Sequence, residues 1–323
     1  MADHAEDDDF DGDIYIYRRG RAPQHITHAR IHESIDEVEE RAFLGCENLL
    51  QVETHDGLRK IGPSAFIGCK SLKRINLKPA VEICQFSFEN CENLESLEFG
   101  DRLETVRGMA FQGCTSIQQL NLPTITEISA CMFRYCKRLT DVELSERLEI
   151  IWPNAFYKCE RLQRIAVPLK RDLLVLDRQI LASEYNQFDF CKQLTTVDLV
   201  GGVHKTIASL HMESWRAEMT AEINRINQVL PNTPAAEKTD EIRQWMESLL
   251  DKLDHYKAVH YKFVREGMTI LALARLKILE ADQFEREGRR RTRGDRKRAR
   301  KVIRVTTGAS IIIRNVLPFL KLE

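Results

Sequence analysis

The chain has 323 residues, of which 43% are hydrophobic and 30% charged, and its formal net charge is −1. That length accommodates one to three domains with cores of their own, and the near-neutral charge argues against a protein whose entire surface binds nucleic acid. Its nine cysteines are an odd number, which argues against a complete set of intramolecular disulfides.

The N-terminus is acidic. Residues 1–13 hold seven acidic side chains and no Lys or Arg, so we expect residues 1–12 to be a disordered, solvated tail. They lack the basic and apolar regions of a secretory signal. The longest apolar stretch, around Met268–Leu279, is too short for the roughly 20 residues that span a bilayer. We therefore expect a cytoplasmic or nuclear protein that has reduced thiols and no contact with a membrane.

Residues 13–36 are interpreted as an N-terminal cap. The segments Asp13–Tyr17 and Ile26–Ile35 alternate apolar and polar residues, which predicts two short strands. The cap also holds three histidines, His25, His28 and His32. In an extended segment only the last two share a face, so no metal site is predicted.

Residues 37–205 are organised by an internal repeat with the pattern Phe-x-x-Cys-x-x-Leu. Five successive copies match at six apolar or cysteine positions, and a looser copy lies on each side of them. The repeat creates a structural ladder of Phe43, Phe66, Phe88, Phe111, Phe133, Phe156, Phe188, Cys46, Cys69, Cys91, Cys114, Cys136, Cys159 and Cys191. Self-similarity of this kind is the sequence signature of a solenoid.

Each position of the repeat has a physical role. The Leu-x-x-Ile-x-Leu stretch is short and extended, which predicts one strand per coil in a parallel sheet. The Ala-Phe-x-x-Cys segment is too short for a stable helix and predicts one helical turn. The residue before the Cys is Gly or Asn in four copies, and both accept the left-handed conformation that ends such a turn. The Phe side chains are expected to stack inside, and the thiols to form a buried ladder rather than disulfides or a zinc site.

The pattern I-x4-A-F-x-x-C-x-x-L-x-x-I-x-L resembles the BspA-like class of leucine-rich repeats over roughly residues 35–200. The resemblance implies an α/β leucine-rich-repeat solenoid with a parallel sheet and short helical turns, used as an interaction module. It names no partner. The Asn ladder of commoner leucine-rich repeats is missing, and Phe with an upstream Cys takes its structural place.

The spacing of the repeat alternates. Successive Phe residues are 23, 22, 23, 22 and 23 residues apart, which indicates duplication of a 45-residue block. Residues 168–187 form an insertion before the last copy, predicted to protrude as a loop or short helix. It is interpreted either as a binding loop or as an apolar flap packed over the last coil.

Residues 206–285 change to a helical period. Two apolar stripes, the second a heptad pattern from Ile242 to Phe263, predict an antiparallel α-helical hairpin that resembles a coiled coil. Thr233 and Pro234 are expected to begin the second helix, and Gly267 marks a candidate bend or break. The apolar stripe of the second helix pairs either within the chain or with a second copy of the chain.

Residues 286–304 are a basic linker with eleven Lys or Arg, and residues 305–323 are expected to dock on the body. The candidate nuclear-import residues are Arg289, Arg290, Arg291, Lys297, Arg298, Arg300 and Lys301. The run is interpreted as an import signal, as a site that binds nucleic-acid phosphates, or as a solvated linker. Deleting 286–304 from a fluorescent fusion tests import, since an unchanged distribution between nucleus and cytosol would end that interpretation.

No catalytic motif, cofactor-binding motif or metal-ligand pattern occurs in the sequence, so we expect a non-enzymatic protein without cofactors. Interaction with another macromolecule is then the expected activity. The strand positions that should face outward are the candidate partner-binding residues Gln51, Glu53, Arg74, Asn76, Ser96, Glu98, Gln119, Asn121, Asp141, Glu143, Arg164, Thr196 and Asp198, together with Ala166.

The outward positions suggest a partner. One of the two rows is mostly acidic, which favours an unidentified protein with a basic surface. Both rows lack aromatic anchors, and the sheet offers only about 500 Å² where a standard interface needs about 800 Å² per partner. The edges, the insertion or the helices must therefore contribute.

Three functions remain open. The first is a non-catalytic protein-interaction scaffold that uses the leucine-rich-repeat surface. The second is a nuclear or nucleic-acid-associated protein that acts through residues 286–304. The third is a cell-surface adhesion protein, which the family name suggests and which the N-terminal sequence and the odd cysteine count oppose.

Overall fold

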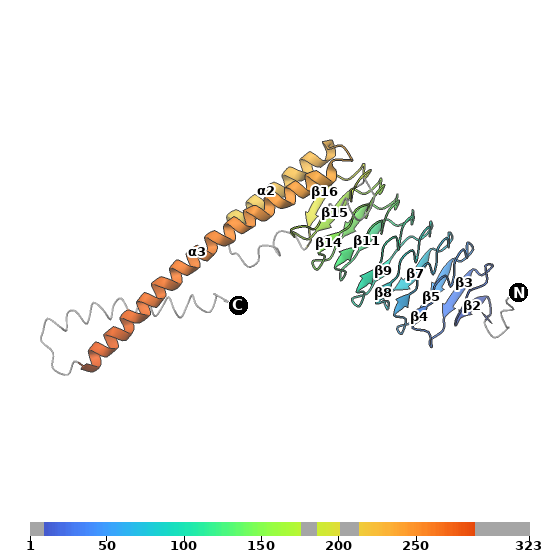
Figure 1. The fold of residues 1–323 in the computed structure, drawn as a ribbon, viewed down its shortest axis with the longest axis horizontal. Coiled ribbons are helices and arrows are strands. Elements are labelled where there is room, and N and C mark those ends of the chain that lie inside the picture. Colours follow the sequence, from blue (N-terminus) through green and yellow to red (C-terminus); the bar gives the residue numbers. More distant parts are fainter. Residues whose placement is uncertain (1–9, 176–185, 201–212, 288–323) are drawn as a thin grey trace. The chain divides into compact units, whose positions relative to one another are not determined.

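The structure, a computed structural model, describes residues 10–175, 186–200 and 213–287 (Figure 1). The predicted acidic tail up to residue 9, the nuclear-import candidates, the basic linker from residue 288 and the C-terminal segment lie outside the described residues. The chain divides into two compact units, residues 1–251 and 252–323. The first unit includes α2 (Glu213–Val229) and the start of α3 (Lys238–Glu287) in addition to the predicted repeat region.

Residues 10–175 and 186–200 form a solenoid whose coils stack in sequence order (Figure 1). Strands of equivalent position pair in parallel and in repeat register, as Val142 does with Ile165. We call their sheet the main sheet. It consists of β1 (Phe10–Asp11), β2 (Ile14–Tyr17), β3 (His28–Ile31), β5 (Gln51–Glu53), β7 (Arg74–Leu77), β9 (Glu98–Phe99), β11 (Gln119–Asn121), β13 (Asp141–Glu143), β15 (Arg164–Val167) and β16 (Thr196–Leu199).

The main sheet departs from regular parallel pairing at two places. At the N-terminal end β1 pairs antiparallel with β2, so a hairpin covers the sheet edge. In the middle, β9 and β11 are not hydrogen-bonded to each other, which divides the main sheet into a six-stranded and a four-stranded part. We call this division the seam.

A second row of strands runs along another side of the solenoid, which corrects the expectation of one strand per coil. Each of these strands has two residues and ends at the aliphatic position five residues before the Phe. They are β4 (Glu37–Val38), β6 (Lys60–Ile61), β8 (Glu82–Ile83), β10 (Thr105–Val106), β12 (Glu127–Ile128) and β14 (Ile150–Ile151). The sequence pattern hid them because a two-residue strand is too short to show alternation.

The segment around each Phe is a series of turns, and the helical turn predicted there is wrong. In the first coil the Cys46 N–H donates to the Phe43 carbonyl at 3.1 Å, and the Phe43 N–H donates to Ala65 of the next coil at 2.7 Å. The N–H groups two residues before and after the Phe also donate to the next coil. These backbone donors hold adjacent coils together, whereas a helix would bond them within one coil.

Two left-handed positions per coil make this geometry. One lies two residues after the Phe, and there the prediction of left-handed Gly or Asn is confirmed, with φ between 59° and 75° at Gly45, Gly68, Asn90 and Gly113. The other, which the sequence analysis missed, lies two residues before the Phe. It is occupied by Arg41, Ser64, Phe86, Met109, Cys131 and Asn154, with φ between 57° and 60°.

The core is a stack of aromatic rings. All seven Phe residues of the ladder are fully buried, and successive rings lie nearly parallel with centroids 4.8–5.7 Å apart. Tyr17 begins the stack 5.0 Å from Phe43. Its hydroxyl accepts a hydrogen bond from the Glu39 N–H, and burial raises the pKa of Tyr17 to about 12. The predicted inward Phe ladder is therefore confirmed and is longer by one ring.

The cysteines form a second ladder beside the rings. All nine thiols are free and buried. In six coils the Cys thiol lies 3.0–3.4 Å from the carbonyl oxygen of the Phe one coil earlier, as Cys69 does from Phe43. This donor role explains why Cys, and no aliphatic residue of similar size, occupies the position.

The 45-residue period also shows in the core. Each coil has a link between its main-sheet strand and the following strand of the second row. In the 23-residue coils this link buries Leu58, Leu103 and Leu148, whereas in the 22-residue coils it buries Ala80 and Ile125. Within the insertion, Leu173 and Leu174 are buried, and Leu174 bridges Ile151 as a seventh member of the second row. The start of the insertion therefore packs like a coil, in agreement with the flap interpretation, and residues 176–185 lie outside the description.

The helices follow the last coil. α2 and α3 are joined by a 3₁₀ turn, η2 (Leu230–Asn232), and the Trp245 indole donates to the Glu222 carbonyl at 3.2 Å between them. The predicted cap at Thr233 is wrong, because α3 begins at Lys238 and the Thr233 hydroxyl bonds to Val229. The helix also runs through Gly267 without a break. None of the described helices is long and apolar enough to span a membrane.

Candidate interaction surfaces

The predicted partner-binding residues lie on one face of the main sheet, which we call the main-sheet face. Most are exposed, and the others are half-buried. The exposed members are Gln51, Arg74, Asn76, Ser96, Glu98, Gln119, Asn121 and Glu143, and the half-buried ones are Glu53, Asp141, Arg164, Thr196 and Asp198. Ala166 was expected to face outward but is 1% exposed, since its methyl group lies in register between the longer side chains of Glu143 and Asp198.

The acidic character expected of this face is largely cancelled. The Arg30 guanidinium lies 2.6 Å from the Glu53 carboxylate, and Lys78 lies 2.6 Å from Glu98. Arg164 joins Asp141 at 3.0 Å and Asp198 at 3.4 Å, across three adjacent strands. Surface pairs of this kind add little stability, but they reduce the net charge that a basic partner would meet. Arg30 and Lys78 were not among the predicted residues because both lie outside the two outward rows of strand positions.

A shallow depression of about 700 Å³ lies across the seam of the main-sheet face. Its lining includes the apolar side chains of Leu97 and Leu120, which are nearly buried. The polar lining comes from Glu95, Gln118 and six predicted partner-binding residues, Ser96, Gln119, Asn121, Asp141, Glu143 and Arg164. The structure therefore brings together, at one place, candidates that the sequence assigned to four separate coils.

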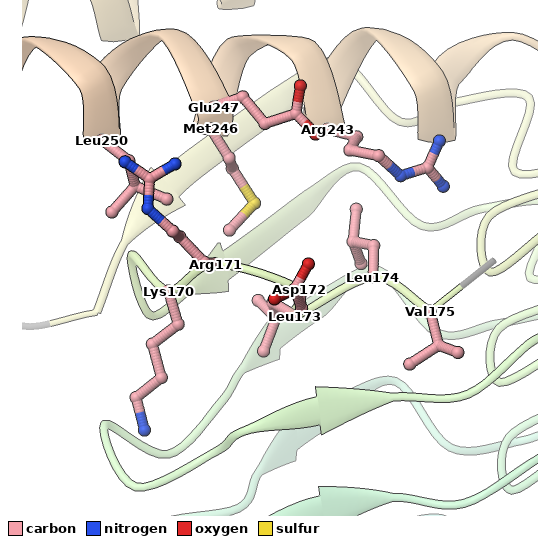
Figure 2. Close-up of a pocket in the computed structure, with 10 residues that line it drawn as sticks. All are labelled: Lys170, Arg171, Asp172, Leu173, Leu174, Val175, Arg243, Met246, Glu247 and Leu250. Carbon is pink, nitrogen blue, oxygen red and sulfur yellow. The ribbon is translucent and has the colours of Figure 1, made fainter.

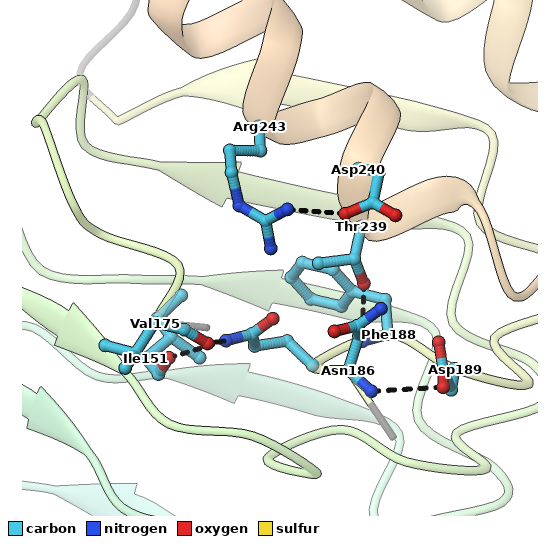
Figure 3. Close-up of polar contacts among 9 residues, drawn as sticks. Ile151, Val175, Asn186, Phe188, Asp189, Thr239, Asp240 and Arg243 are labelled. Carbon is cyan, nitrogen blue, oxygen red and sulfur yellow. Dashed lines mark hydrogen bonds and ion pairs between the residues drawn. The ribbon is translucent and has the colours of Figure 1, made fainter. Parts of the chain in front are cut away.

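The C-terminal end of the solenoid is closed by polar contacts to α3 (Figure 3). The last ladder residue, Phe188, has no following coil, and its N–H donates to the Thr239 hydroxyl at 3.2 Å. The Gln187 amide bridges the carbonyls of Ile151 and Val175 at 2.9 and 2.7 Å. Thr239 thus supplies the acceptor that a further coil would supply by its backbone.

Two more side chains complete this cap. The Lys238 ammonium is buried and donates to the backbone carbonyls of Lys192 and Leu194, and burial lowers its pKa. Asn227 of α2 accepts a hydrogen bond from the Val197 N–H at 2.8 Å, at the last strand of the main sheet. Sequence reasoning missed these residues because their partners lie 30–46 positions away with no repeat to align them.

A cavity of about 280 Å³ lies between the start of the insertion and α3 (Figure 2). Met246 and Leu250 line it from the helix, and Leu173 and Leu174 line it from the insertion. Its charges are mixed and partly paired, since Arg171 lies 3.1 Å from Asp251 and Arg243 lies 2.5 Å from Asp240. In Figure 2 the Lys170 side chain points away from the helix. The cavity is best explained as incomplete packing of the cap.

The turns around the ladder Phe residues form one edge of the solenoid, which we call the turn edge. A third surface lies on the turn edge of the last three coils and was not predicted from the sequence. We call it the aromatic–basic patch, and it consists of Arg134, Tyr135, Tyr157, Lys158 and Phe190. The rings meet edge to face, with centroids 5.7 Å apart for Tyr135 and Tyr157 and 5.3 Å for Tyr157 and Phe190. Arg134 lies 4.8 and 4.9 Å over two of them, and Lys158 lies 5.4–5.5 Å from all three.

Backbone conformation marks the same patch. Tyr135, Lys158 and Phe190 hold the left-handed position that Gly or Asn holds in the first four coils, with φ of 63°, 58° and 63°. Left-handed backbone costs an L-residue roughly 1–2 kcal/mol, and the last three coils incur this cost at a position where the first four coils have Gly or Asn. The signal was present in the sequence, because the Gly/Asn pattern before the Cys stops after the fourth copy.

The titratable groups of the described residues do not suggest catalysis. The largest upward shifts of pKa belong to buried ladder thiols, such as those of Cys69 and Cys91, and desolvation is the main cause. A thiol that burial keeps protonated is a poor nucleophile. Among the described residues, no cluster of three or more His, Cys, Asp or Glu side chains is arranged to hold a metal ion.

Parallel coils, a stacked Phe ladder and one outward-facing sheet define a leucine-rich-repeat solenoid. The family model of the BspA type leucine-rich repeat region matches residues 22–83, 78–173 and 117–212, which together are more than half of the chain. The chain therefore belongs to the BspA type leucine-rich-repeat family, as its resemblance to that class predicted. No curated protein sequence matches it significantly.

Several solved structures are similar to the chain. A leucine-rich cell surface protein from Faecalibacterium prausnitzii is 22% identical with a TM-score of 0.41, over 58% of this chain and 49% of that one. A leucine-rich repeat protein from T. pallidum is 25% identical with a TM-score of 0.38, over 57% and 72% of the two chains. One from Bacteroides ovatus is 19% identical with a TM-score of 0.35, over 51% and 59%. The chain spans about half the length of the first of these.

Proposed function

We propose that the protein is a non-catalytic interaction scaffold whose main-sheet face, at the depression across the seam, binds a segment of a partner protein. The observation that carries this proposal is the convergence of six predicted partner-binding side chains around a nearly buried apolar floor. A few oriented polar groups around apolar surface are typical of recognition sites. Membership of a repeat family that generally serves protein binding supports the same function.

The construction of the solenoid suits this role. Both ends are closed and the ring stack is fully buried, so the main-sheet face is held by a rigid interior. Rigid presentation of a surface lowers the entropy cost of binding. The face has no aromatic anchor among its predicted residues, and hot spots of tight interfaces are enriched in Trp, Tyr and Arg. We therefore expect moderate affinity from this face alone.

Site-specific photo-crosslinking tests the proposal. A photoreactive amino acid at Gln119, on the depression, is expected to give discrete crosslinked products in cells that naturally contain the protein. The matched control places the same amino acid at Glu127, which is also exposed but lies in the second row of strands.

The change of Gln119 and Asn121 to Ala in the full-length protein, with the photoreactive group moved to Ser96, is expected to reduce the products several-fold, as loss of interface hydrogen bonds predicts. Equal products from positions 119 and 127 would contradict a binding role for the main-sheet face.

A further inference from the structure

The turn edge of the last three coils differs in charge from that of the first four. In the five-residue segment that begins one residue after each ladder Phe, the first four coils carry three acidic residues and one basic residue. The same segment of the last three coils carries two acidic residues and six basic ones, Arg134, Lys137, Arg138, Lys158, Arg161 and Lys192. One of those two acids, Asp189, is buried. The solenoid therefore concentrates positive charge at the aromatic–basic patch.

These six cations are available to a partner. Four of them are exposed, and the other two, Arg134 and Lys158, are half-buried on the rings. Within the residues that the structure describes, none of the six forms an ion pair with a carboxylate. Several cations elsewhere on the solenoid are neutralised, as Lys70 is by Glu47 at 2.8 Å. Unpaired, clustered cations on a rigid frame attract anionic groups.

The rings orient two of the cations. Arg134 also donates to the Tyr135 hydroxyl at 3.2 Å, which fixes its guanidinium above the ring. Cation–π contacts and this hydrogen bond restrict the rotamers of Arg134 and Lys158 before any partner arrives. The left-handed backbone at Tyr135, Lys158 and Phe190 is the conformational cost of placing these side chains there.

We propose that the aromatic–basic patch, with its surrounding cations, is a docking site for an acidic polypeptide segment, one rich in Asp and Glu, of a partner protein. The proposal rests on the role of the protein as an interaction scaffold and adds a second surface to it. Successive coils here are 5.6–5.7 Å apart at the ring stack. Alternate residues of an extended peptide are about 6.7 Å apart, so neighbouring acids on one face of the peptide can meet neighbouring coils.

The same observations disfavour a nucleic acid. Base recognition by aromatic residues needs an open ring face, but Arg134 and Lys158 cover the ring faces. A longer polyanion would also run along the edge toward Glu89 and Glu92, which repel it. A short run of carboxylates fits the three basic coils and stops before the acidic ones.

Fluorescence anisotropy of the whole chain tests the proposal with two labelled probes. One is a 12-residue peptide of alternating Glu and Gly, and the other is a single-stranded RNA of mixed sequence with the same number of nucleotides. We expect the peptide to bind in low salt and weaken as salt is added. The double change Arg134→Gln and Lys158→Gln should weaken peptide binding at least about fivefold, as expected for loss of two charge contacts.

Two Lys at one repeat position provide a matched control. Lys137 and Lys70 both directly follow the ladder Cys, but only Lys137 belongs to the basic coils. Lys137→Gln should weaken the peptide about twofold, and Lys70→Gln should leave it unchanged, because a rim charge contributes modestly. Phe190→Gly removes a ring from a position that tolerates Gly, so it should weaken binding without unfolding the chain.

The outcomes separate the two surfaces. Absence of peptide binding, or equal weakening by Lys70→Gln and Lys137→Gln, overturns the docking proposal. RNA binding that is tighter than peptide binding and lost in the same variants also overturns it, in favour of a nucleic-acid site. Crosslinking at Gln119 that persists in the Arg134→Gln/Lys158→Gln variant leaves the scaffold role intact when the patch fails. If the photoreactive group at Gln119 gives no discrete products but the peptide still binds, the proposal for the main-sheet face fails and the docking proposal stands.

Discussion

The interior and the turn edge of the solenoid follow different rules. Inside, every coil from Phe43 to Phe188 repeats one ring and one thiol, since each must fit the coil before and after it. On the turn edge the first four coils hold Gly or Asn at the left-handed position, and the last three hold Tyr, Lys and Phe. Uniformity therefore marks what stabilises the stack, and a departure from uniformity marks a surface with another purpose.

Alkaline pH should break the interior first. Burial raises the pKa of the Cys46 thiol to about 11 and that of Cys69 further, whereas an unfolded thiol titrates near 8.5. The folded state thus binds more protons above pH 8.5, and its stability, fully present below that pH, falls as pH rises. Each ladder thiol contributes a loss of up to about 1.4 kcal/mol per pH unit.

Urea unfolding at pH 7, 8, 9 and 10, followed by circular dichroism, measures this effect. The midpoint should be constant up to pH 8 and then fall steeply. Lys238 has the opposite effect on stability because burial lowers its pKa, but it is one group against nine buried thiols. A midpoint that stays level to pH 10 would show that the thiols are exposed to solvent in the folded state.

Truncation of a ring compares interior with edge directly. Phe111→Ala removes a fully buried ring that contacts Phe88, Phe133 and Phe99, and should lower the free energy of unfolding by about 3–5 kcal/mol. Phe190→Gly should change it by less than about 1 kcal/mol, because relief of left-handed strain offsets the lost contact. Chemical denaturation of both variants gives the two values, and equal losses would remove the distinction between interior and edge.

The C-terminal cap should show a smaller effect. Thr239→Val keeps the shape of the side chain but removes the acceptor of the Phe188 N–H, and leaves a buried donor unpaired. The expected loss is about 1–3 kcal/mol, with faster amide exchange at Phe188. Thr239→Ser keeps the hydroxyl and is the matched control. Similar exchange rates in the two variants would mean that the hydroxyl does not close the last coil.

The least stability change is expected at the aromatic–basic patch. Arg134→Gln with Lys158→Gln alters two half-buried cations without ion-pair partners among the described residues, so only their contacts with the rings are lost and the free energy of unfolding should change by less than about 1 kcal/mol. The same variant should lose acidic-peptide binding. A large loss of stability, measured by thermal denaturation, would instead assign the patch a structural role.

The sequence predicted the interior well because the solenoid solves one packing problem repeatedly. Phe, Cys and the Leu-x-x-Ile-x-Leu positions align by count alone, and their burial follows. The second row of strands was missed because its two-residue strands, such as β6, carry no alternation. The turns were misjudged as helical because their hydrogen bonds run to the next coil, and spacing within one coil does not show them.

The surfaces were predicted less completely, since they depend on residues outside the repeat. Arg30 and Lys78 neutralise parts of the main-sheet face from neighbouring positions. Thr239 meets Phe188 only because α2 and the turn η2 bring the start of α3 back to the last coil. The departure from Gly at Tyr135 and Phe190 was readable, but its meaning required the structure, which shows the cations above the rings.

The turn-edge hydrogen bonds give the solenoid a direction. Backbone N–H groups of each coil point to the next, so the first coil presents carbonyls, satisfied by the Ala22 N–H and the Gln24 amide, and the last presents donors, satisfied in part by Thr239. Without these end groups, the free carbonyls at the first coil and the free N–H donors at the last coil would be complementary to each other. A chain that lacked both the N-terminal end groups and the helices would then be a monomer for open-ended, head-to-tail growth. The helices that follow the repeats limit the stack to the length of one polypeptide.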